Sequence, residues 1–532
     1  MNVVAVLDGL TLGQALRRTA RKYPDNTLFK GEGGPVDFAD FDIAVDRLAS
    51  GLLGLGLARG DHLALWLANS YEWALSFCAC ARIGVVVVPI NTRYTAPEAA
   101  YILRQSDARA LVMTRRLWGK DFARLLADML PEGLRGAPEL RHLAWVGGDG
   151  DPAGIVFEDL AATSVNRAAL DAAEAAVGPR DPLLICYTSG TTGKPKGAMH
   201  DHRVIKQATR VGLAMRLEPG GSVLGHMPLY HVAGLYMALV PAITLGGAFV
   251  NMQQWDAARA LELMEREKVT CFGGIPTHFV DLVGDPSLGG RDLSSLKAAW
   301  IGGSPVMQAT YERFRSALGL PHLLSTYGMT ENTISTTFNR FDDPVEDCAA
   351  NRAPVLCESE VRVVDPATGT PLAAGEVGEV WCRGETVMMG YYRDPKATRE
   401  AINAEGWLRT GDLGRFDERG FLSITGRLKE MYKSGGTNVY PAEIEQHLSR
   451  HPAVKMAAVV GVPDERLSEV GFAFVELNPG CSFDAGQMRA HCKGVLADYK
   501  IPRHLAVVAE LPRTSTGKIQ RSALLALAVK PA

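Results

Sequence analysis

A run of glycine, hydroxyl and lysine side chains directly after an apolar strand constrains this chain more than any other feature. Residues Leu183 to Cys186 are apolar and predict a buried strand. The next eleven residues, Tyr187 to Gly197, contain three glycines, four aliphatic hydroxyls and two lysines. Glycines let backbone N–H groups turn toward an anion, hydroxyls add donors and lysines add positive charge. The segment therefore predicts a phosphate-binding loop, with contacts expected from Thr188, Ser189, Gly190, Thr191, Thr192, Gly193 and Lys196.

This loop is not a Walker A loop. A Walker A loop needs a longer spacer between its glycines. Here two residues separate Gly190 from Gly193, and Pro195 follows Lys194. An ordinary surface loop rich in Ser, Thr and Gly is the alternative interpretation. The density of phosphate donors directly after a strand argues against that alternative.

A second motif, residues 325–331, combines an aromatic ring, a glycine, hydroxyls and a carboxylate. The ring of Tyr327 beside Gly328 can lie flat on a purine. The hydroxyl of Thr330 can reach an α-phosphate, and the carboxylate of Glu331 can hold Mg²⁺. By itself the motif also fits a turn with a solvated glutamate. Together with the phosphate loop it indicates a nucleotide site.

Two glycine-rich turns close predicted buried strands. Residues 269–275 and 297–301 are apolar and run into Gly-Gly-Ile-Pro and Gly-Gly-Ser-Pro. In open α/β sheets, ligands bind at the carboxyl ends of strands. The residues expected at the adenine site are therefore Gly303, Ser304, Pro305, Tyr327 and Gly328.

Four motifs, in this order along the chain, resemble those of the adenylate-forming superfamily, which includes acyl- and aryl-CoA synthetases, luciferases and nonribosomal peptide adenylation domains. They are the segments 187–197, 325–331, 407–412 and 512–519. The resemblance covers essentially the whole chain. It implies ATP, Mg²⁺ and coenzyme A as cofactors and a small-molecule carboxylic acid as partner.

The resemblance assigns roles to further residues. It places Asp412 on the ribose, which suits a carboxylate because it accepts two hydrogen bonds from a vicinal diol, and Arg427 on the nucleotide. Lys518 is expected to bridge the substrate carboxylate and the α-phosphate, because a cation between two approaching anions lowers the barrier. Lys429 matches the hinge. The expected passage for the pantetheine arm of CoA is lined by Ser434, Gly435 and Gly436, although a plain flexible turn would use the same glycines.

Alternating strand and helix patterns predict a doubly wound α/β sheet with right-handed crossovers. Strands are expected at 62–68, 85–90 and 108–113, with helices at 72–83 and 97–105 between them. Residues 115–182 give no periodic signal and are expected to be rich in loops. Near the start, Thr11 is expected to cap a helix that ends before Pro24.

A chain of 532 residues is too long for one hydrophobic core. We expect an N-terminal adenylation domain over residues 1–427 and a mobile C-terminal lid over residues 428–532. The resemblance implies layered αβαβα subdomains with a distorted barrel in the first and an α+β fold in the second.

The composition excludes several partners. With a formal net charge of −3, the chain has no basic field for nucleic acid or anionic lipid. The nine cysteines show no metal-binding spacing and are expected to be buried, reduced thiols. The uncharged stretch 223–254 contains prolines, histidines and glycines, and is expected to be a buried strand–turn–helix segment without an integral membrane span. The first ten residues lack a signal-peptide pattern, so we expect a cytoplasmic protein. A homodimer is left open.

The acyl pocket is expected to be lined by Met227, His231, Gly303, Ser325, Gly328 and Thr333. The resemblance places His231, which follows Met-Pro-Leu-Tyr, at the junction of acyl group and phosphate. These segments contain no lysine or arginine for a second carboxylate, and no acidic group stands where amino-acid-activating enzymes hold the amine. We therefore expect an apolar monocarboxylic acid: a medium- or long-chain fatty acid, an alicyclic acid or an aryl acid.

The leading interpretation is an ATP-dependent carboxylate–CoA ligase that acts through an acyl-adenylate. The alternatives are a stand-alone enzyme that loads a carrier protein, and a catalytically silent nucleotide-binding homologue. A catalytically silent homologue would be free to lose the residues that carry the reaction. All four of these are present, which argues against this alternative: Lys196, Glu331, Asp412 and Lys518.

Two positions depart from the family pattern. Residues 350–354 read Ala-Asn-Arg-Ala-Pro where relatives often have Gly-x-Pro, and Ser468 stands where a glycine is expected. We expect these departures to affect loop conformation near the nucleotide and the lid, and to leave the reaction class unchanged.

Overall fold

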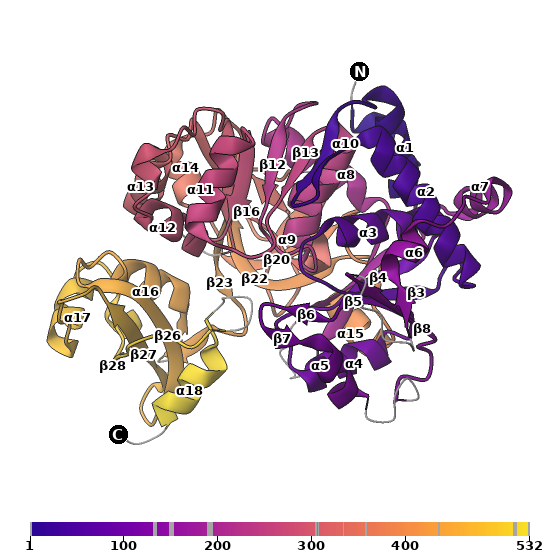
Figure 1. Ribbon diagram of the computed structural model, residues 1–532. Coiled ribbons are helices and arrows are strands. Elements are labelled where there is room, and N and C mark those ends of the chain that lie inside the picture. The colour runs from indigo at the N-terminus through magenta and orange to yellow at the C-terminus, as the bar shows by residue number, and fades with distance from the viewer. Residues whose placement is uncertain are drawn as a thin grey trace.

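The computed structural model of the chain describes residues 3–130, 136–147, 154–188, 195–303, 306, 308–333, 335–356, 359–434, 437–513 and 519–529, without the side chains of Asn438 and Val529. Four main sheets organise these residues. Two are large and mostly parallel, one is antiparallel, and one belongs to a smaller C-terminal unit. In Figure 1 that unit lies at the lower left and joins the rest of the chain near β23.

The first large sheet, here the β16 sheet, has eight strands. Its six central strands pair in parallel, and its two edge strands are antiparallel to their neighbours. Its order is β17 (Thr337–Phe338), β16 (His322–Tyr327), β15 (Ala298–Gly302), β14 (Cys271–Gly274), β12 (Ser222–Gly225), β13 (Ala248–Asn251), β1 (Thr27–Gly31) and β2 (Gly34–Asp37).

The second large sheet, here the β10 sheet, also has eight strands and is parallel from β10 to β9. Its order is β21 (Gly390–Tyr391), β11 (Lys196–Asp201), β10 (Pro182–Thr188), β4 (Val86–Pro89), β3 (His62–Trp66), β5 (Ala108–Thr114), β8 (His142–Val146) and β9 (Ile155–Val156). The strands and helices expected between residues 62 and 113 are all present, with α3 at Tyr71–Ile83 and α4 at Ala96–Gln105.

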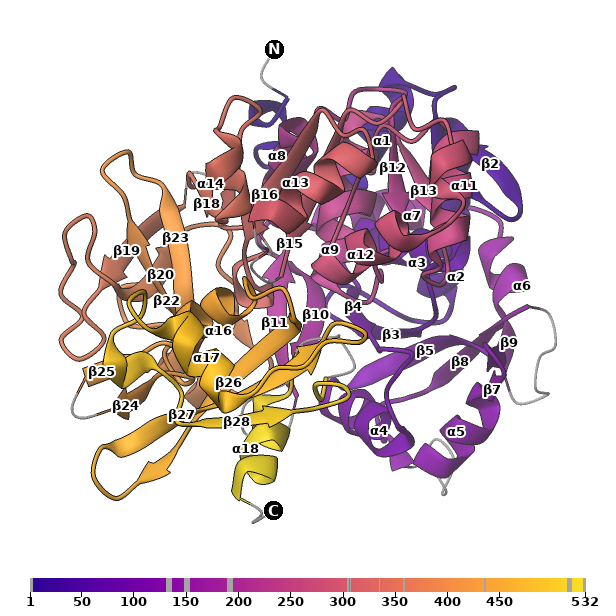
Figure 2. The same ribbon diagram turned by 90° about the vertical axis from the view of Figure 1, so that its left-hand side faces the viewer.

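The helices form three layers, one between the two sheets and one on the outer face of each sheet, as Figures 1 and 2 show. The middle layer packs on both sheets and contains α1 (Leu12–Lys22), α2 (Phe38–Gly54), α3, α8 (Val204–Ala214) and α10 (Val240–Leu245). The outer layer of the β10 sheet contains α4 and α5 (Phe122–Met129). The outer layer of the β16 sheet contains α11 (Ala257–Arg266), α12 (Pro276–Gly284) and α13 (Gln308–Ala317). The expected αβαβα layering is therefore confirmed.

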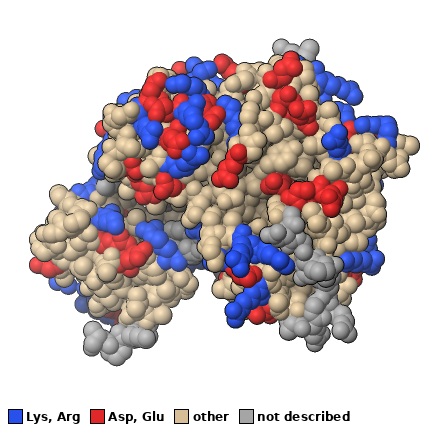
Figure 3. All heavy atoms as spheres, viewed as in Figure 1, with Lys and Arg blue, Asp and Glu red and all other residues tan. Residues whose placement is uncertain are grey.

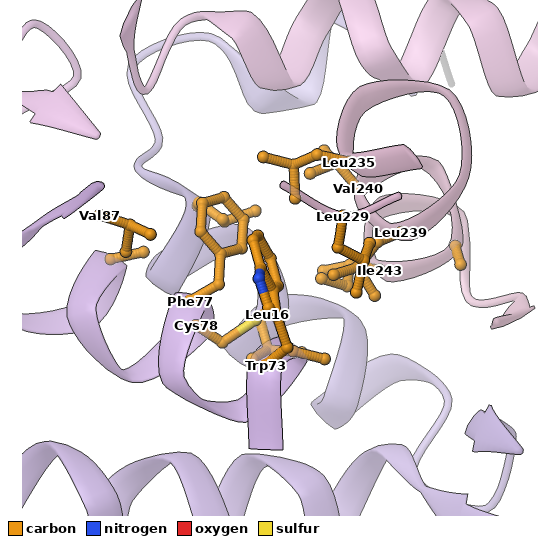
Figure 4. Packing of buried hydrophobic residues seen from close by; sticks show 14 of the residues in the cluster. Leu16, Trp73, Phe77, Cys78, Val87, Leu229, Leu235, Leu239, Val240 and Ile243 are labelled. Carbon is orange, nitrogen blue, oxygen red and sulfur yellow. The ribbon is translucent and has the colours of Figure 1, made fainter. Parts of the chain in front are cut away.

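The middle layer holds the uncharged stretch 223–254. After β12 it forms α9 (Val232–Gly234), a π-helical turn (Leu235–Leu239) and α10, all of them buried. Figure 4 shows Leu239 and Ile243 from this segment beside Trp73 of α3 and Leu16 of α1. Most of this stretch therefore lies in the hydrophobic core between the two large sheets. No helix in the described part of the chain is long and apolar enough to cross a bilayer.

The antiparallel sheet and the C-terminal unit follow residue 350. The antiparallel sheet runs β18 (Arg352–Ala353), β23 (Leu422–Arg427), β22 (Leu408–Phe416), β20 (Gly378–Arg383) and β19 (Glu360–Val364). The C-terminal unit, here the lid, contains α16 (Pro441–Leu448), α17 (Ala485–Cys492), α18 (Arg521–Val529), β24 (Tyr432–Ser434), β25 (Thr437–Val439), β26 (Val454–Asp464), β27 (Ser468–Leu477) and β28 (His504–Val507). The boundary at residue 428 stays a prediction.

The remaining short elements are α6 (Phe157–Ala161), α7 (Arg167–Ala176), α14 (Val345–Ala349), α15 (Pro395–Ala401), β6 (Arg116–Leu117) and β7 (Lys120–Asp121). The elements that lie within 115–182, namely α5, α6, α7 and β6 to β9, show that the expectation of a loop-rich stretch there was wrong. The elements there are short, and several of their side chains remain exposed, so the sequence pattern carries no sustained period.

One other expectation needed correction. Among the described cysteines, Cys481 is exposed, whereas the others are buried. In the lid, α17 ends at Cys492, because Lys493 has an extended backbone and Gly494 then has a φ of +82°. By contrast, Thr11 caps α1 with a reciprocal pair of hydrogen bonds to Gln14, as predicted.

Candidate nucleotide and acyl site

Glu331 joins the first two sequence motifs. β10 ends at Thr188, and the short 3-10 turn Thr330–Asn332 follows β16. The Thr188 hydroxyl donates to Glu331 Oε1 over 3.4 Å, and the hydroxyl of Tyr391 donates to the same oxygen over 3.0 Å. The ammonium group of Lys196 lies 5.3 Å from the centre of the Tyr391 ring. Phosphate-loop and carboxylate motifs that lie far apart in sequence thus meet at one carboxylate.

A buried histidine supports the backbone of the same turn. His200 of β11 is 1% exposed, and its Nε2 lies 2.7 Å from the carbonyl oxygen of Thr330. Its Nδ1 lies 3.3 Å from the hydroxyl of Tyr236. Burial lowers the pKa of His200 to about 4, so the ring is neutral at pH 7. A neutral ring with Nε2–H as donor can hold the Thr330 carbonyl while Nδ1 accepts from Tyr236.

The second and third motifs meet at Asp412. The hydroxyl of Tyr327, the last residue of β16, donates to Asp412 Oδ2 over 2.7 Å. On the other side, Arg427 Nε lies 3.1 Å from Asp412 Oδ1. Burial and the neighbouring carboxylate raise the pKa of Tyr327 well above its usual value, which keeps this hydroxyl a donor. Asp412 and Arg427 are paired residues of β22 and β23, so the antiparallel sheet carries both to the end of β16.

The loop that precedes His231 is fixed by one asparagine. Asn69, between β3 and α3, is 2% exposed. Its Nδ2 donates to the carbonyl oxygens of Gly225 at 3.0 Å and Met227 at 2.8 Å, and its Oδ1 accepts the Leu229 N–H at 2.7 Å. His231 then caps α9 by accepting the Ala233 N–H at Nδ1 over 3.2 Å. This side-chain amide therefore sets the path of the segment that carries Met227 and His231.

The other residues expected in the acyl and adenine sites have different environments. Gly303 has a φ of +85°, and a Cβ there would lie 3.2 Å from Ile275 Cγ2. Gly328 is exposed. Ser325 and Thr333 are 3% and 1% exposed, and their hydroxyls donate to Asn339 Oδ1 and to the Thr386 carbonyl over 2.6 Å each. Their hydroxyls are therefore engaged within the protein, and any contact with an acyl group must come from other atoms.

Several expected site residues lie outside the described residues: Ser189, Gly190, Thr191, Thr192, Gly193, Ser304, Pro305, Gly435, Gly436 and Lys518. In the described part of the lid region, Lys429 is exposed and lies next to the Leu428 N–H, which donates to the Gly411 carbonyl over 2.8 Å. Ser434 is 1% exposed, and its hydroxyl has no hydrogen-bond partner among the described residues.

Glu331 offers a carboxylate suited to Mg²⁺. Proteins usually bind Mg²⁺ through one or two carboxylates together with substrate phosphates and water. Among the described residues, no group of three or more His, Cys, Asp or Glu side chains could hold a metal ion by itself. A single carboxylate beside the phosphate loop fits a metal ion that arrives with the nucleotide.

Three residues of this site escaped the sequence analysis: Asn69, His200 and Tyr391. Each makes its contact across more than fifty residues of sequence, to Leu229, Thr330 and Glu331 respectively. A lone buried asparagine, histidine or tyrosine has no local pattern, and no spacing rule links it to its partner. Their partners become visible when the β10 and β16 sheets are placed together.

The layered fold and the hydroxyl, carboxylate and basic groups that meet at the strand ends fit a nucleotide-binding enzyme. Residues 16–392 match the family described as AMP-binding enzyme, and residues 443–518 match the C-terminal domain of AMP-binding enzymes. The chain belongs to this family, in the acyl-CoA ligase branch of the adenylate-forming superfamily.

Relatives along the whole chain agree with this placement. A 3-(7a-methyl-1,5-dioxo-octahydro-1H-inden-4-yl)propanoyl:CoA ligase from Rhodococcus jostii is 36% identical, covering 97% of this chain and 98% of the relative. A mitochondrial medium-chain acyl-CoA ligase, ACSF2, from Danio rerio is 34% identical, covering 97% and 88%. The crystal structure of the anthranilate CoA ligase AuaEII with anthranoyl-AMP is 27% identical, with a TM-score of 0.85 and 99% of each chain covered.

Proposed function

We propose that this enzyme joins an apolar monocarboxylic acid to coenzyme A at the expense of ATP. In the first half-reaction a carboxylate oxygen attacks the α-phosphorus, which forms acyl-AMP and releases pyrophosphate. In the second the CoA thiol attacks the acyl carbon, loses its proton and displaces AMP. The observation that carries the proposal is the meeting of Thr188, Glu331 and Tyr391 on one side with Tyr327, Asp412 and Arg427 on the other.

The described residues suit distinct parts of the nucleotide. Thr188 and Lys196 flank the phosphate loop and provide a donor and a positive charge. Asp412 would accept the ribose hydroxyls, and its contacts with Tyr327 and Arg427, which orient the carboxylate, support this role. Glu331 would hold Mg²⁺, and that ion would neutralise charge on the leaving pyrophosphate. Thr330 lies beside Glu331, where its hydroxyl can meet the α-phosphate.

The remaining assignments complete the proposal. Lys518 would bridge the two reacting anions in the first half-reaction, and Lys429 would be the hinge about which the lid turns for the second. Ser434, with Gly435 and Gly436, would line the path of the pantetheine arm. The acid would lie near Met227 and His231, as a fatty, alicyclic or aryl acid. A cytoplasmic location and a homodimer also stay predictions.

The first test is pyrophosphate release with ATP and Mg²⁺ across a panel of carboxylic acids, with and without CoA. Stimulation by CoA, with acyl-CoA detected by mass spectrometry, would support the ligase. Slow pyrophosphate release at the same rate with and without CoA would instead favour the loading of a carrier protein. No release with any acid would favour the silent homologue.

A second test separates the half-reactions. Lys518→Ala should abolish acyl-AMP formation and leave the thiolation of supplied acyl-AMP nearly unchanged. Lys493→Ala is the control, because Lys493 is an exposed lid lysine just beyond α17. Equal loss of both half-reactions in Lys518→Ala would contradict the alternating use of the lid.

A further inference from the structure

Two histidines and a tryptophan form a compact cluster at the carboxyl ends of β12, β13 and β14. His226 follows β12, Trp255 follows β13, and His278 lies in the first turn of α12, which follows β14. His226 Nε2 and His278 Nδ1 are 3.2 Å apart, and the Trp255 ring centre lies 4.3 Å from that of His278 and 4.8 Å from that of His226. Trp255 Nε1 donates to Asp281 Oδ2 over 2.8 Å, which anchors the ring.

The cluster borders the proposed acyl site on two sides. His226 directly precedes Met227, whose carbonyl oxygen is held by Asn69. On the other side, a Cβ on Gly303 would lie 3.2 Å from Ile275, and a Cβ on Gly274 would lie 2.6 Å from His278 Nδ1. A side chain at position 274 would therefore displace the imidazole. His226 thus lies at the end of β12, which supplies Met227, and His278 follows β14, the neighbour of the strand β15 that supplies Gly303.

This pair leaves hydrogen-bonding capacity unused. His226 is 5% exposed, and its Nδ1 has no partner among the residues that the structure describes. Burial lowers the pKa of His278 to about 4 and holds that of His226 well below its usual value, and the positive charge of Arg93 acts on His278 in the same direction. Both rings are therefore neutral at pH 7. A buried polar atom without a partner is unfavourable, and native proteins usually satisfy it with a protein group, a water or a ligand.

A neutral imidazole pair can serve either a donor or an acceptor. When His226 Nε2–H donates to His278 Nδ1, the free nitrogens are a bare His226 Nδ1 and a His278 Nε2–H. When the direction reverses, the two free nitrogens exchange these roles. The pair therefore suits an uncharged oxygen. It can donate to a ketone oxygen and can accept from a hydroxyl.

We propose that His226 and His278 recognise a ketone or hydroxyl oxygen carried on the acyl group away from its carboxylate. The inference rests on the proposed ligase function and narrows its substrate class from plain apolar acids to acids with at least one internal ketone or hydroxyl. The dioxo-indenyl propanoate named for the R. jostii relative has this chemistry, as a property of that relative. A plain alkyl chain would cover the two imidazoles without forming a hydrogen bond to their nitrogens. We therefore expect the enzyme to select against a plain alkyl acid.

The test compares matched acids with one carbon skeleton. Each saturated C8 to C12 acid is paired with acids that carry an oxo group at successive positions, and kcat/KM is measured for both. In the native enzyme the best oxo acid should exceed its plain partner at least tenfold. His278→Leu should lower this ratio about tenfold, with the KM for ATP changed less than twofold.

Two further variants separate recognition from damage to the fold. His278→Gln retains a donor and an acceptor and should keep most of the ratio. His142→Leu, which alters a half-buried histidine at the start of β8, should leave it unchanged. An equal or lower kcat/KM for every oxo acid, or an unchanged ratio in His278→Leu, would overturn the proposal. Preference for a second carboxylate would also overturn it, because Arg93 would then be the recognising group.

A binding readout keeps this inference distinct from the ligase proposal. Trp255 stacks on His278, so its fluorescence should change when an oxo acid binds, whether or not turnover follows. If no acid is turned over, the ligase proposal fails. Selective binding of the oxo acid, lost in His278→Leu, would still support the imidazole site, and equal binding of both acids would refute it.

Discussion

Ser468 occupies a backbone conformation that favours glycine, and this makes a sharp prediction about the lid. β26 and β27 form a hairpin in which Asp464 pairs with Ser468. Asp464 Oδ1 accepts the N–H groups of Arg466 and Leu467 over 3.0 and 2.9 Å, and Ser468 then has a φ of +70°. A tight loop followed by a left-handed residue is the bulged hairpin in which glycine is usual. The departure noted in the sequence therefore places a Cβ where none is favoured.

Ser468→Gly should stabilise the lid. A left-handed conformation costs a non-glycine residue about 1–2 kcal/mol, and glycine adds about 0.5–1 kcal/mol of backbone entropy to the unfolded chain. The side chain is exposed, so its removal disrupts no core packing. The net gain in the free energy of unfolding is about 0.5–1 kcal/mol, which corresponds to about 2–8 °C in Tm for a unit of roughly 100 residues.

The assay is calorimetry of the full-length protein, with hydrogen exchange of the β26–β27 amides to assign the change to the lid. Ser468→Ala is the matched control, because alanine keeps the Cβ and the strain, and should give no gain. If Ser468→Gly left the Tm and the exchange rates unchanged, or if alanine stabilised as much as glycine, the strain argument would be refuted.

Three other predictions test the site. Tyr327→Phe removes the hydrogen bond to Asp412 while keeping the ring, and should raise the KM for ATP about tenfold, since hydrogen bonds to charged groups contribute about 1.5–3 kcal/mol. Asn69→Asp removes the donors to Gly225 and Met227 and should raise the KM for the acid more than that for ATP in steady-state kinetics. His200 has a pKa of about 4 in the folded protein and about 6.5 in the unfolded chain. The free energy of unfolding should therefore fall by up to about 3 kcal/mol as the pH falls from 6.5 toward 4. His200→Gln should make this pH dependence weaker when denaturation is measured at several pH values.

The sequence allowed the layers to be predicted wherever strands and helices were long and periodic. The α3 and α4 pattern between β3, β4 and β5 is of this kind. The 325–331 motif predicted a role for Glu331 at a nucleotide site, and the resemblance to the family assigned Asp412 to the ribose; both roles stay predictions. The prediction for residues 115–182 was wrong because β8, β9 and α6 are too short to give a sustained periodic pattern. Contacts such as Tyr391 to Glu331 could not be predicted, because sheet order, and not sequence spacing, brings β21 beside β11.

The Ser468 and residue 350–354 departures show what a sequence comparison leaves undecided. Asn351 has a φ of +49°, and asparagine adopts this conformation more readily than most residues. The backbone therefore keeps its left-handed turn there with a tolerant side chain. At Ser468 the same conformation is kept with a less tolerant one. Both positions therefore hold a non-glycine side chain in the left-handed region, and neither is among the residues assigned to the reaction.

The hydrogen-bond acceptor positions that the Asp412 carboxylate can offer to the ribose can be counted. An ionised carboxylate accepts about four hydrogen bonds on its two oxygens. Tyr327 occupies one position on Oδ2, and Arg427 occupies one on Oδ1. Counted over the described residues, one acceptor position therefore remains on each oxygen, which is what two neighbouring hydroxyls of a ribose require. Tyr327 and Arg427 fix the plane of the carboxylate without consuming the positions that the diol needs. Arg427 also directly precedes Leu428, whose N–H holds the Gly411 carbonyl beside Asp412, so the proposed ribose contact and the proposed hinge share one short stretch of backbone.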